Sequence, residues 1–234
     1  MERRTTVRAI LAALAAASAA GLWWHGPIPQ DPGYHHFADQ RTLLGIPNAL
    51  DVLSNVPIGA AGAWGLLQAR MRATPWALWA AVGLLLTGIG SSYYHAVPDS
   101  PRLFWDRLPL TVVFMAWFAA VLADRAQVRL LWPLLLVGVA SVLYWRATDD
   151  LRPYAWVQFF PMLALLLLVV ALPGRDLSTR GVLWVIALYA AAKAGEALDR
   201  PIFALTGVVS GHTLKHLIAG VAGFRLLALT PATR

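Results

Sequence analysis

The sequence has no cysteine among its 234 residues. Without thiols it can form neither a disulfide nor a thiolate zinc or iron–sulfur site, so any metal would need histidine and carboxylate ligands. Charged residues are also scarce, at 13% of the chain against about 25% in soluble domains. So little charge cannot cover the surface of a water-soluble domain of this length. Disorder is excluded for the opposite reason, because 59% of the residues are hydrophobic and would stay exposed to solvent.

Long apolar runs make up most of what is present. A helix needs about 20 apolar residues to cross a bilayer core of about 30 Å, and the sequence has eight runs of this kind, separated mostly by short polar gaps. To within a few residues, the runs are Val7–Trp24, Leu50–Leu67, Pro75–Tyr94, Trp105–Ala123, Leu130–Trp145, Tyr154–Leu172, Gly181–Leu198 and His212–Leu229. The sequence therefore predicts an all-α polytopic membrane protein with a seven-helix transmembrane core and one additional N-terminal transmembrane helix.

The first run has two interpretations. Arginines precede an alanine-rich stretch, a pattern that also fits a cleavable signal peptide. The stretch is long for a signal peptide, and Trp23 and Trp24 at its end are typical of an interfacial anchor. We expect residues 1–26 to form a retained hydrophobic helix and residues 27–234 to form the seven-helix domain.

The arginines predict the orientation in the membrane, since cytoplasmic ends are richer in basic residues. One set of helix ends carries eleven arginines and the alternating set carries six. The larger set is Arg3, Arg4, Arg8, Arg70, Arg72, Arg125, Arg129, Arg175, Arg180, Arg225 and Arg234. This split predicts that both termini are cytoplasmic, and the alanine- and arginine-rich composition favours a bacterial inner membrane. The basic residues do not form a patch, so the net charge of +7 does not indicate a nucleic-acid partner.

Polar side chains gather at three helix ends that this topology puts on the same, periplasmic side. Ionisable residues within spans are costly and suggest function. His212 and His216 are four residues apart and share one helix face, with about 5–6 Å between their Cβ atoms. His95, at the end of the third span, can add a third imidazole, and three histidines with an open position are typical of catalytic zinc. Taken alone, such a pair could equally hydrogen-bond to water and to nearby loops.

Ser91 and Asp106 lie near these histidines in the predicted topology. Ser91 precedes His95 by four residues, so its hydroxyl could donate to a developing oxyanion, although serine in a membrane helix often bonds back to its own backbone. Asp106 opens the fourth predicted span, where it could instead cap the helix.

Together these residues resemble a known family. The order Ser91, His95, Asp106, His212 and His216 is similar to that of the alkaline ceramidases and adiponectin-receptor-like membrane hydrolases, the CREST superfamily. Short flanking segments are also similar to those of this family: Ser54-Asn55-Val-Pro57, Phe-Trp-Asp-Arg-Leu-Pro and His-Thr-Leu-Lys-His. The resemblance covers roughly residues 37–229.

The resemblance implies zinc ligands at His95, His212 and His216. It also implies that Asp106 orients or deprotonates the zinc water and that Ser91 stabilises the oxyanion. Zinc lowers the pKa of bound water to about 7 and polarises a carbonyl, which is coherent with these roles. Animal ceramidases bind calcium through an acidic, tryptophan-containing segment, and this chain lacks such a run, so we do not predict calcium.

The resulting hypothesis is zinc-dependent hydrolysis of the amide bond of a ceramide-like lipid that reaches the site from the bilayer. Two alternatives stay open: hydrolysis of an ester or another lipid, such as a GPI-like anchor, on the same site, and a non-catalytic receptor or scaffold with structural zinc. A zinc site closed by four protein ligands would favour the scaffold, whereas an open position would favour the enzyme.

Other polar residues have structural interpretations. Lys193 and Glu196 in the seventh predicted span are expected to pair with each other, with Lys215 as a further partner, which makes charge tolerable at depth. The histidines of the long loop, His25, His35 and His36, are expected to be ordinary interfacial residues.

Overall fold

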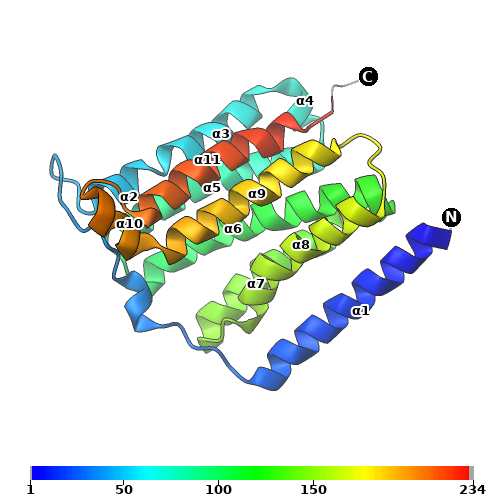
Figure 1. Ribbon diagram of the computed structural model, residues 1–234, viewed down its shortest axis with the longest axis horizontal. Helices are drawn as coiled ribbons and strands as arrows, with labels where there is room; N and C mark the ends of the chain where they lie inside the picture. The colour runs from blue at the N-terminus through cyan, green and yellow to red at the C-terminus, as the bar shows by residue number, and fades with distance from the viewer. Residues whose placement is uncertain (1, 232–234) are drawn as a thin grey trace.

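The computed structural model describes residues 2–231, which fold into a bundle of helices (Figure 1). Within that range no β-strand forms beyond an isolated bridge between Leu43 and Ile46. The long helices are α1 (Glu2–His25), α3 (Val56–Leu67), α5 (Pro75–Ala96), α6 (Ser100–Val121), α7 (Leu131–Thr148), α8 (Arg152–Ala171), α9 (Thr179–Ala197) and α11 (Gly211–Ala228). Shorter pieces are η1 (Pro32–His35), α2 (Ala49–Leu53), α4 (Ala69–Arg72), the π-helical turn η2 (Leu122–Ala126) and α10 (Asp199–Thr206). The predicted all-α fold is confirmed.

Six helices are long and apolar enough to cross a membrane, and a seventh is added if α9 and α10, bent by 75° to each other, form one span. The eighth expected span falls on α11, which has 18 residues but is not among these helices. It carries Lys215, Arg225 and two histidines. Length and apolarity thus support six or seven of the eight expected crossings.

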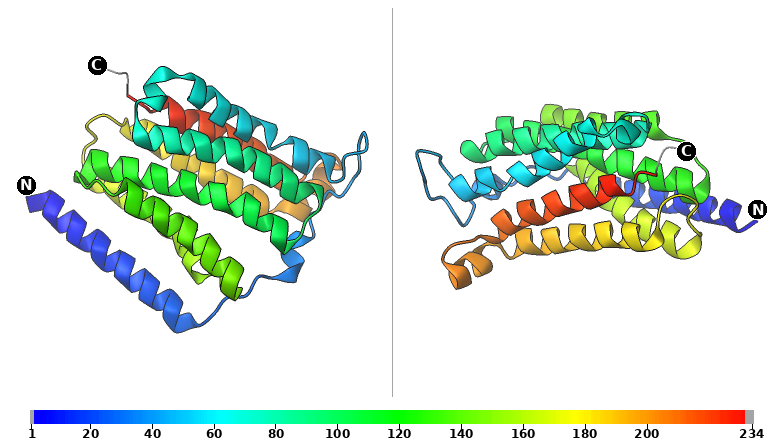
Figure 2. Two further views of the ribbon diagram at one scale, coloured as in Figure 1. Left: turned by 180° about the vertical axis from the view of Figure 1, so that it is seen from behind. Right: turned by 90° about the horizontal axis from the view of Figure 1, so that it is seen from above.

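The chain crosses the bundle from end to end with each long helix (Figure 1). The start of α1 and the end of α11 lie at one end, and the long loop with η1 and α10 lies at the other. Arg234, one of the arginines that predicted the orientation, lies outside the described residues. Helix α1 packs at the edge of the bundle against α8 (Figure 2). Arg8 Nε donates to the carbonyl of Ala126 at one end of α1 (2.8 Å), and Arg152 Nη1 donates to that of Trp23 at the other (3.0 Å).

Two sequence expectations about element boundaries were wrong. The fourth span begins at Ser100 rather than Trp105, because Asp99 Oδ1 accepts a hydrogen bond from the backbone N–H of Arg102 (2.7 Å) and caps the helix. The expected loop from Asp199 to Gly211 contains α10, which ends at Thr206 and is followed by Gly207 with positive φ (66°). Both departures lie at the loop end of the bundle, where the candidate site also lies.

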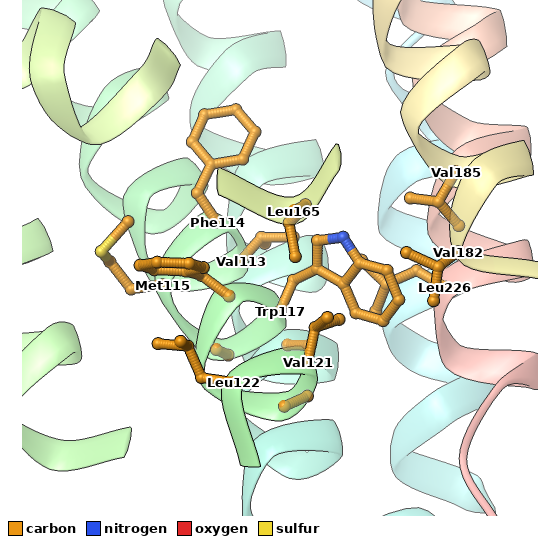
Figure 3. Packing of buried hydrophobic residues seen from close by; sticks show 14 of the residues in the cluster. Val113, Phe114, Met115, Trp117, Val121, Leu122, Leu165, Val182, Val185 and Leu226 are labelled. Carbon is orange, nitrogen blue, oxygen red and sulfur yellow. The ribbon is translucent and has the colours of Figure 1, made fainter. Parts of the chain in front are cut away.

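Helix α6 runs through the middle of the apolar core (Figure 3). Trp117, only 1% exposed, extends from α6 toward Val182 of α9 and Leu226 of α11. Lipid tails are as apolar as these side chains, so close van der Waals packing, rather than transfer from water, holds such helices together in a bilayer. This packing fixes the relative positions of α5, α6, α9 and α11, which carry the polar side chains at the loop end.

Candidate metal centre

His95, His212 and His216 converge at the loop end of the bundle. His95 belongs to the last turn of α5, and the other two face it from the first two turns of α11. One ring nitrogen from each lies within 4.8 Å of the others, and all three side chains are buried, at 1–3% exposure. The three imidazoles that the sequence suggested as ligands are therefore brought together, in a group that can hold a metal ion.

The spacing of two of the ring nitrogens fits a tetrahedral ion. The Nε2 atoms of His95 and His212 are 3.2 Å apart, and metal–nitrogen bonds of about 2.0–2.1 Å at a tetrahedral angle separate two ligand nitrogens by about 3.3 Å. His216 uses Nδ1 for hydrogen bonds, which leaves its Nε2 free for an ion. No carboxylate or fourth histidine joins this group among the described residues. The three histidines can thus hold a metal ion without a fourth side chain from this group.

Asp51 of α2 and Ser54, the residue that follows this helix, hold His216 and the start of α11. Ser54 Oγ lies 2.9 Å from His216 Nδ1, and the backbone oxygen of Asp51 lies 3.1 Å from the same nitrogen. The Asp51 carboxylate accepts a hydrogen bond from the hydroxyl of Thr213 (2.7 Å). Partners on the second ring nitrogen fix the orientation of a metal-binding imidazole. No spacing or periodicity in the sequence predicts the position of Ser54 beside His216.

The long loop covers the histidines from the other side. The ring of Phe37 packs 4.6 Å from that of His95 and 4.4 Å from that of His212, measured between centroids. The Asp199 carboxylate ties loop and helix together, because it accepts from the backbone N–H of Ala38 (2.8 Å) and from that of His212 (2.9 Å). The loop is therefore part of the site, a contribution that sequence patterns did not indicate.

Ser91 and Asp106 meet where α5 crosses α6. A Cβ on Gly90 would lie 2.1 Å from the backbone oxygen of Trp105, so only glycine allows the two helices to approach this closely. The side chains of Ser91 and Asp106 lie within hydrogen-bonding distance of each other as a result. Asp106 stands in the second turn of α6, so the alternative in which it caps the helix is wrong. That role belongs to Asp99.

A cavity of about 140 Å³, here called the inner cavity, runs from this polar end into the bundle. Tyr34, Asp106, Lys193, Glu196 and Lys215 line its polar end. Apolar side chains of α5, α6, α8, α9 and α11 line the rest, among them Leu84, Phe114, Trp117, Met162, Val185 and Leu226. The space has the character of a pocket for an apolar chain with a polar group at one end.

The charges at the polar end pair as expected. Lys193 and Lys215 both contact the Glu196 carboxylate, Lys215 Nζ at 2.7 Å from Oε1. Lys215 Nζ also lies 3.5 Å from His212 Nε2, which links the inner cavity to the histidines. A carboxylate shared by two ammonium groups makes burial of these charges tolerable.

The other three histidines, His25, His35 and His36, do not join the candidate metal centre. His35 Nδ1 lies 2.9 Å from the Tyr94 hydroxyl and Nε2 lies 3.1 Å from the Ser100 hydroxyl. Partial burial lowers the pKa of His35 below its usual value. His25 and His36 are exposed. Within residues 2–231, the group of His95, His212 and His216 is the only gathering of metal-ligating side chains.

Comparisons with protein-family models, with characterised proteins and with solved structures give no significant match for this chain. Its function therefore has to be argued from the geometry of the site and from the residue pattern.

Proposed function

We propose that this protein is a zinc-dependent, membrane-embedded hydrolase of the alkaline ceramidase type, which cleaves the amide bond of a ceramide-like lipid to a fatty acid and a sphingoid-type amine. One observation carries the proposal: three buried imidazoles, with ring nitrogens within 4.8 Å, lie beside the polar end of an apolar cavity. Asp106 and Lys215 line that end, and Lys215 Nζ lies 3.5 Å from His212 Nε2. The site thus combines three possible metal ligands, the carboxylate of Asp106 and a space for an acyl chain.

The roles of the residues follow from the reaction. Water adds to the amide carbonyl, the carbon–nitrogen bond breaks, and one proton moves from the water to the leaving amine. His95, His212 and His216 would hold the zinc, which would supply an activated water and a Lewis acid. The Asp106 carboxylate accepts the water proton and returns it to the amine nitrogen. Ser91, which is within reach of Asp106 in the free protein, turns its hydroxyl to the carbonyl oxygen as negative charge develops there.

The alternatives are weighed by the same geometry. A structural zinc site is closed by four protein ligands, whereas only three side chains form the group among the described residues. This supports the enzyme over the scaffold. Nothing in the cavity distinguishes an amide from an ester, so the substrate test includes both.

The test is a substrate survey. Purified protein in nanodiscs is incubated with N-acyl sphingoid lipids, phospholipid esters and a total lipid extract, and the released fatty acid is measured by mass spectrometry. We expect fatty acid to be released from the N-acyl lipids, to stop on addition of a chelator and to resume with zinc. Unchanged release by His212→Ala, with His25→Ala as the matched control, would contradict the proposal.

We propose in addition that both termini face the cytoplasm and that the metal centre faces the periplasm of a bacterial inner membrane. The arginine distribution supports this orientation, and because the chain has no cysteine, single cysteines can report it. Ser100→Cys and Gly207→Cys should react with a membrane-impermeant thiol reagent in intact spheroplasts, and Thr74→Cys should not. The reverse pattern would invert the topology.

A further inference from the structure

A second hollow lies on the loop side of the metal centre. This outer cleft, of about 290 Å³, is lined by Tyr34, His36, Phe37, Glu196, Arg200 and His212, among others. Its walls carry charged and imidazole groups at the loop end, whereas most of the inner cavity is apolar. His212 borders the outer cleft, and Lys215, three residues further along α11, borders the inner cavity. The first turn of α11 therefore separates the two spaces.

Two residues line both spaces. They are Tyr34 and Glu196, and the Tyr34 hydroxyl lies 3.5 Å from Glu196 Oε1. Glu196 is held in place from behind by Lys193 and Lys215. The Tyr34–Glu196 contact thus forms a second part of the wall between the outer cleft and the inner cavity, beside the first turn of α11.

Tyr34 belongs to a short element rather than to a long helix. It lies in η1, a single turn that Asp31 caps by accepting from the backbone N–H of Gly33 (2.8 Å). Its neighbour His35 anchors the turn to Tyr94, and its own ring packs on the guanidinium of Arg107 (5.3 Å). A side chain on such a turn can change position without unpacking the bundle, unlike one on α6 or α9.

We infer that the outer cleft is the aqueous entrance to the metal centre, and that the contact between Tyr34 and Glu196 is the barrier that keeps water out of the inner cavity. A hydrolase of lipids needs such a division, because water must reach the bond to be cleaved while the acyl chain stays in an apolar space. Its importance for catalysis rests on the proposed function. The barrier itself is a property of the fold and can be tested without activity.

Single cysteines on α9 test the barrier. Ala197→Cys lines the outer cleft and Ala192→Cys, five residues earlier, lines the inner cavity. Because thiol reactivity follows access, a charged, water-soluble methanethiosulfonate should modify Ala197→Cys more than about tenfold faster than Ala192→Cys. Adding Tyr34→Ala should raise the rate at Ala192→Cys about tenfold. Tyr93→Ala, which removes an exposed tyrosine of α5, is the matched control and should leave that rate unchanged.

A second measurement avoids altering Tyr34. Protein loaded with zinc is modified at Ala197→Cys or, as control, at Gly207→Cys, which lies outside both spaces, and the release of zinc to EDTA is followed. A bulky adduct at Ala197→Cys should slow release about tenfold, and the adduct at Gly207→Cys should not.

Equal reactivity of Ala192→Cys and Ala197→Cys, or zinc release that is indifferent to the adduct at Ala197→Cys, would overturn the inference. The outcome is separable from the proposed function. If labelling follows the prediction but no lipid is hydrolysed, the aqueous entrance is supported and the proposed hydrolase function is rejected. If lipid is hydrolysed but the two cysteines are labelled equally, the hydrolase function is supported and the barrier is rejected.

Discussion

The six histidines form two groups of three, of which only one brings its imidazoles together. His25, His35 and His36 lie within twelve residues, from the last residue of α1 into the long loop, yet His25 and His36 are exposed and His35 hydrogen-bonds to Tyr94 and Ser100. The other three are spread over more than a hundred residues and converge within 4.8 Å. Proximity in sequence does not build the candidate site. Regular helical spacing on α11 and the packing of α5 against neighbouring helices do, because a helix fixes which residues share a face.

The largest difference between the two groups of histidines is expected when one imidazole is removed from each. We expect His216→Ala to reduce zinc from about one per chain to near none, because the described residues offer no spare ligand. Where zinc is present at about a thousand times its dissociation constant, its loss also removes about 4 kcal/mol of stabilisation. Elemental analysis and thermal melting measure both effects. His25→Ala should change neither, and similar losses in the two variants would contradict the assignment.

The next prediction separates binding from chemistry at the same site. Asp106→Asn and Ser91→Ala should keep zinc but lower the rate of lipid hydrolysis by about 10²–10³, the usual effect of removing one group that acts on the transition state. Rate and metal content are measured on the same samples. Asp99→Asn is the control on the same helix, since Asp99 caps α6 and should affect stability rather than rate. A normal rate in Ser91→Ala would assign that hydroxyl a purely structural role.

A smaller effect is expected one step away from the ligands. Ser54→Ala removes the hydroxyl beside His216 Nδ1 and leaves the Asp51 carbonyl in place. Loss of such a partner lowers metal affinity by about 10–100-fold, and we expect the lower end of that range. Competition with a zinc-binding dye measures the affinity. Ser92→Ala, whose hydroxyl donates to the carbonyl of Val52, should bind zinc normally. Equal affinities in the two variants would show that Ser54 does not position His216.

The smallest effect concerns the loop group. Burial lowers the pKa of His35 in the folded protein, so the unfolded chain takes up a proton more readily. The stability that neutral His35 contributes is therefore complete above its unfolded pKa of about 6.5 and is lost as the pH falls below it. Melting temperatures of His35→Asn should fall less between pH 7 and pH 5 than those of the unmodified protein. His25→Asn should retain the full pH dependence, and a parallel fall in all three proteins would exclude His35 as its source.

Much of the fold followed from the sequence, because apolar runs of spanning length allow few structures other than membrane helices. The pairing of Lys193 and Lys215 with Glu196 followed from the cost of burying charge, and the structure confirms it. The early start of α6 was also readable, since Asp99 followed by Pro101 is a typical helix beginning.

What escaped prediction depends on tertiary contacts. Three contacts of the site join segments that are more than fifty residues apart. They are those of Phe37 with the histidines, of Tyr34 with Glu196 and of Ser54 with His216. No periodicity marks such positions, because their partners are determined by how the loop and α2 pack against α9 and α11. The same holds for the approach of α5 to α6 at Gly90, where a glycine acts through a neighbour that the sequence does not identify.

The claim that His95, His212 and His216 bind one metal ion is tested most directly by X-ray absorption at the zinc edge on protein purified without chelators. We predict one zinc per chain, with three imidazole nitrogens at about 2.0–2.1 Å and an oxygen of water as the fourth ligand. Protein without a transition metal, or the same spectrum after all three histidines are replaced by alanine, would contradict the account.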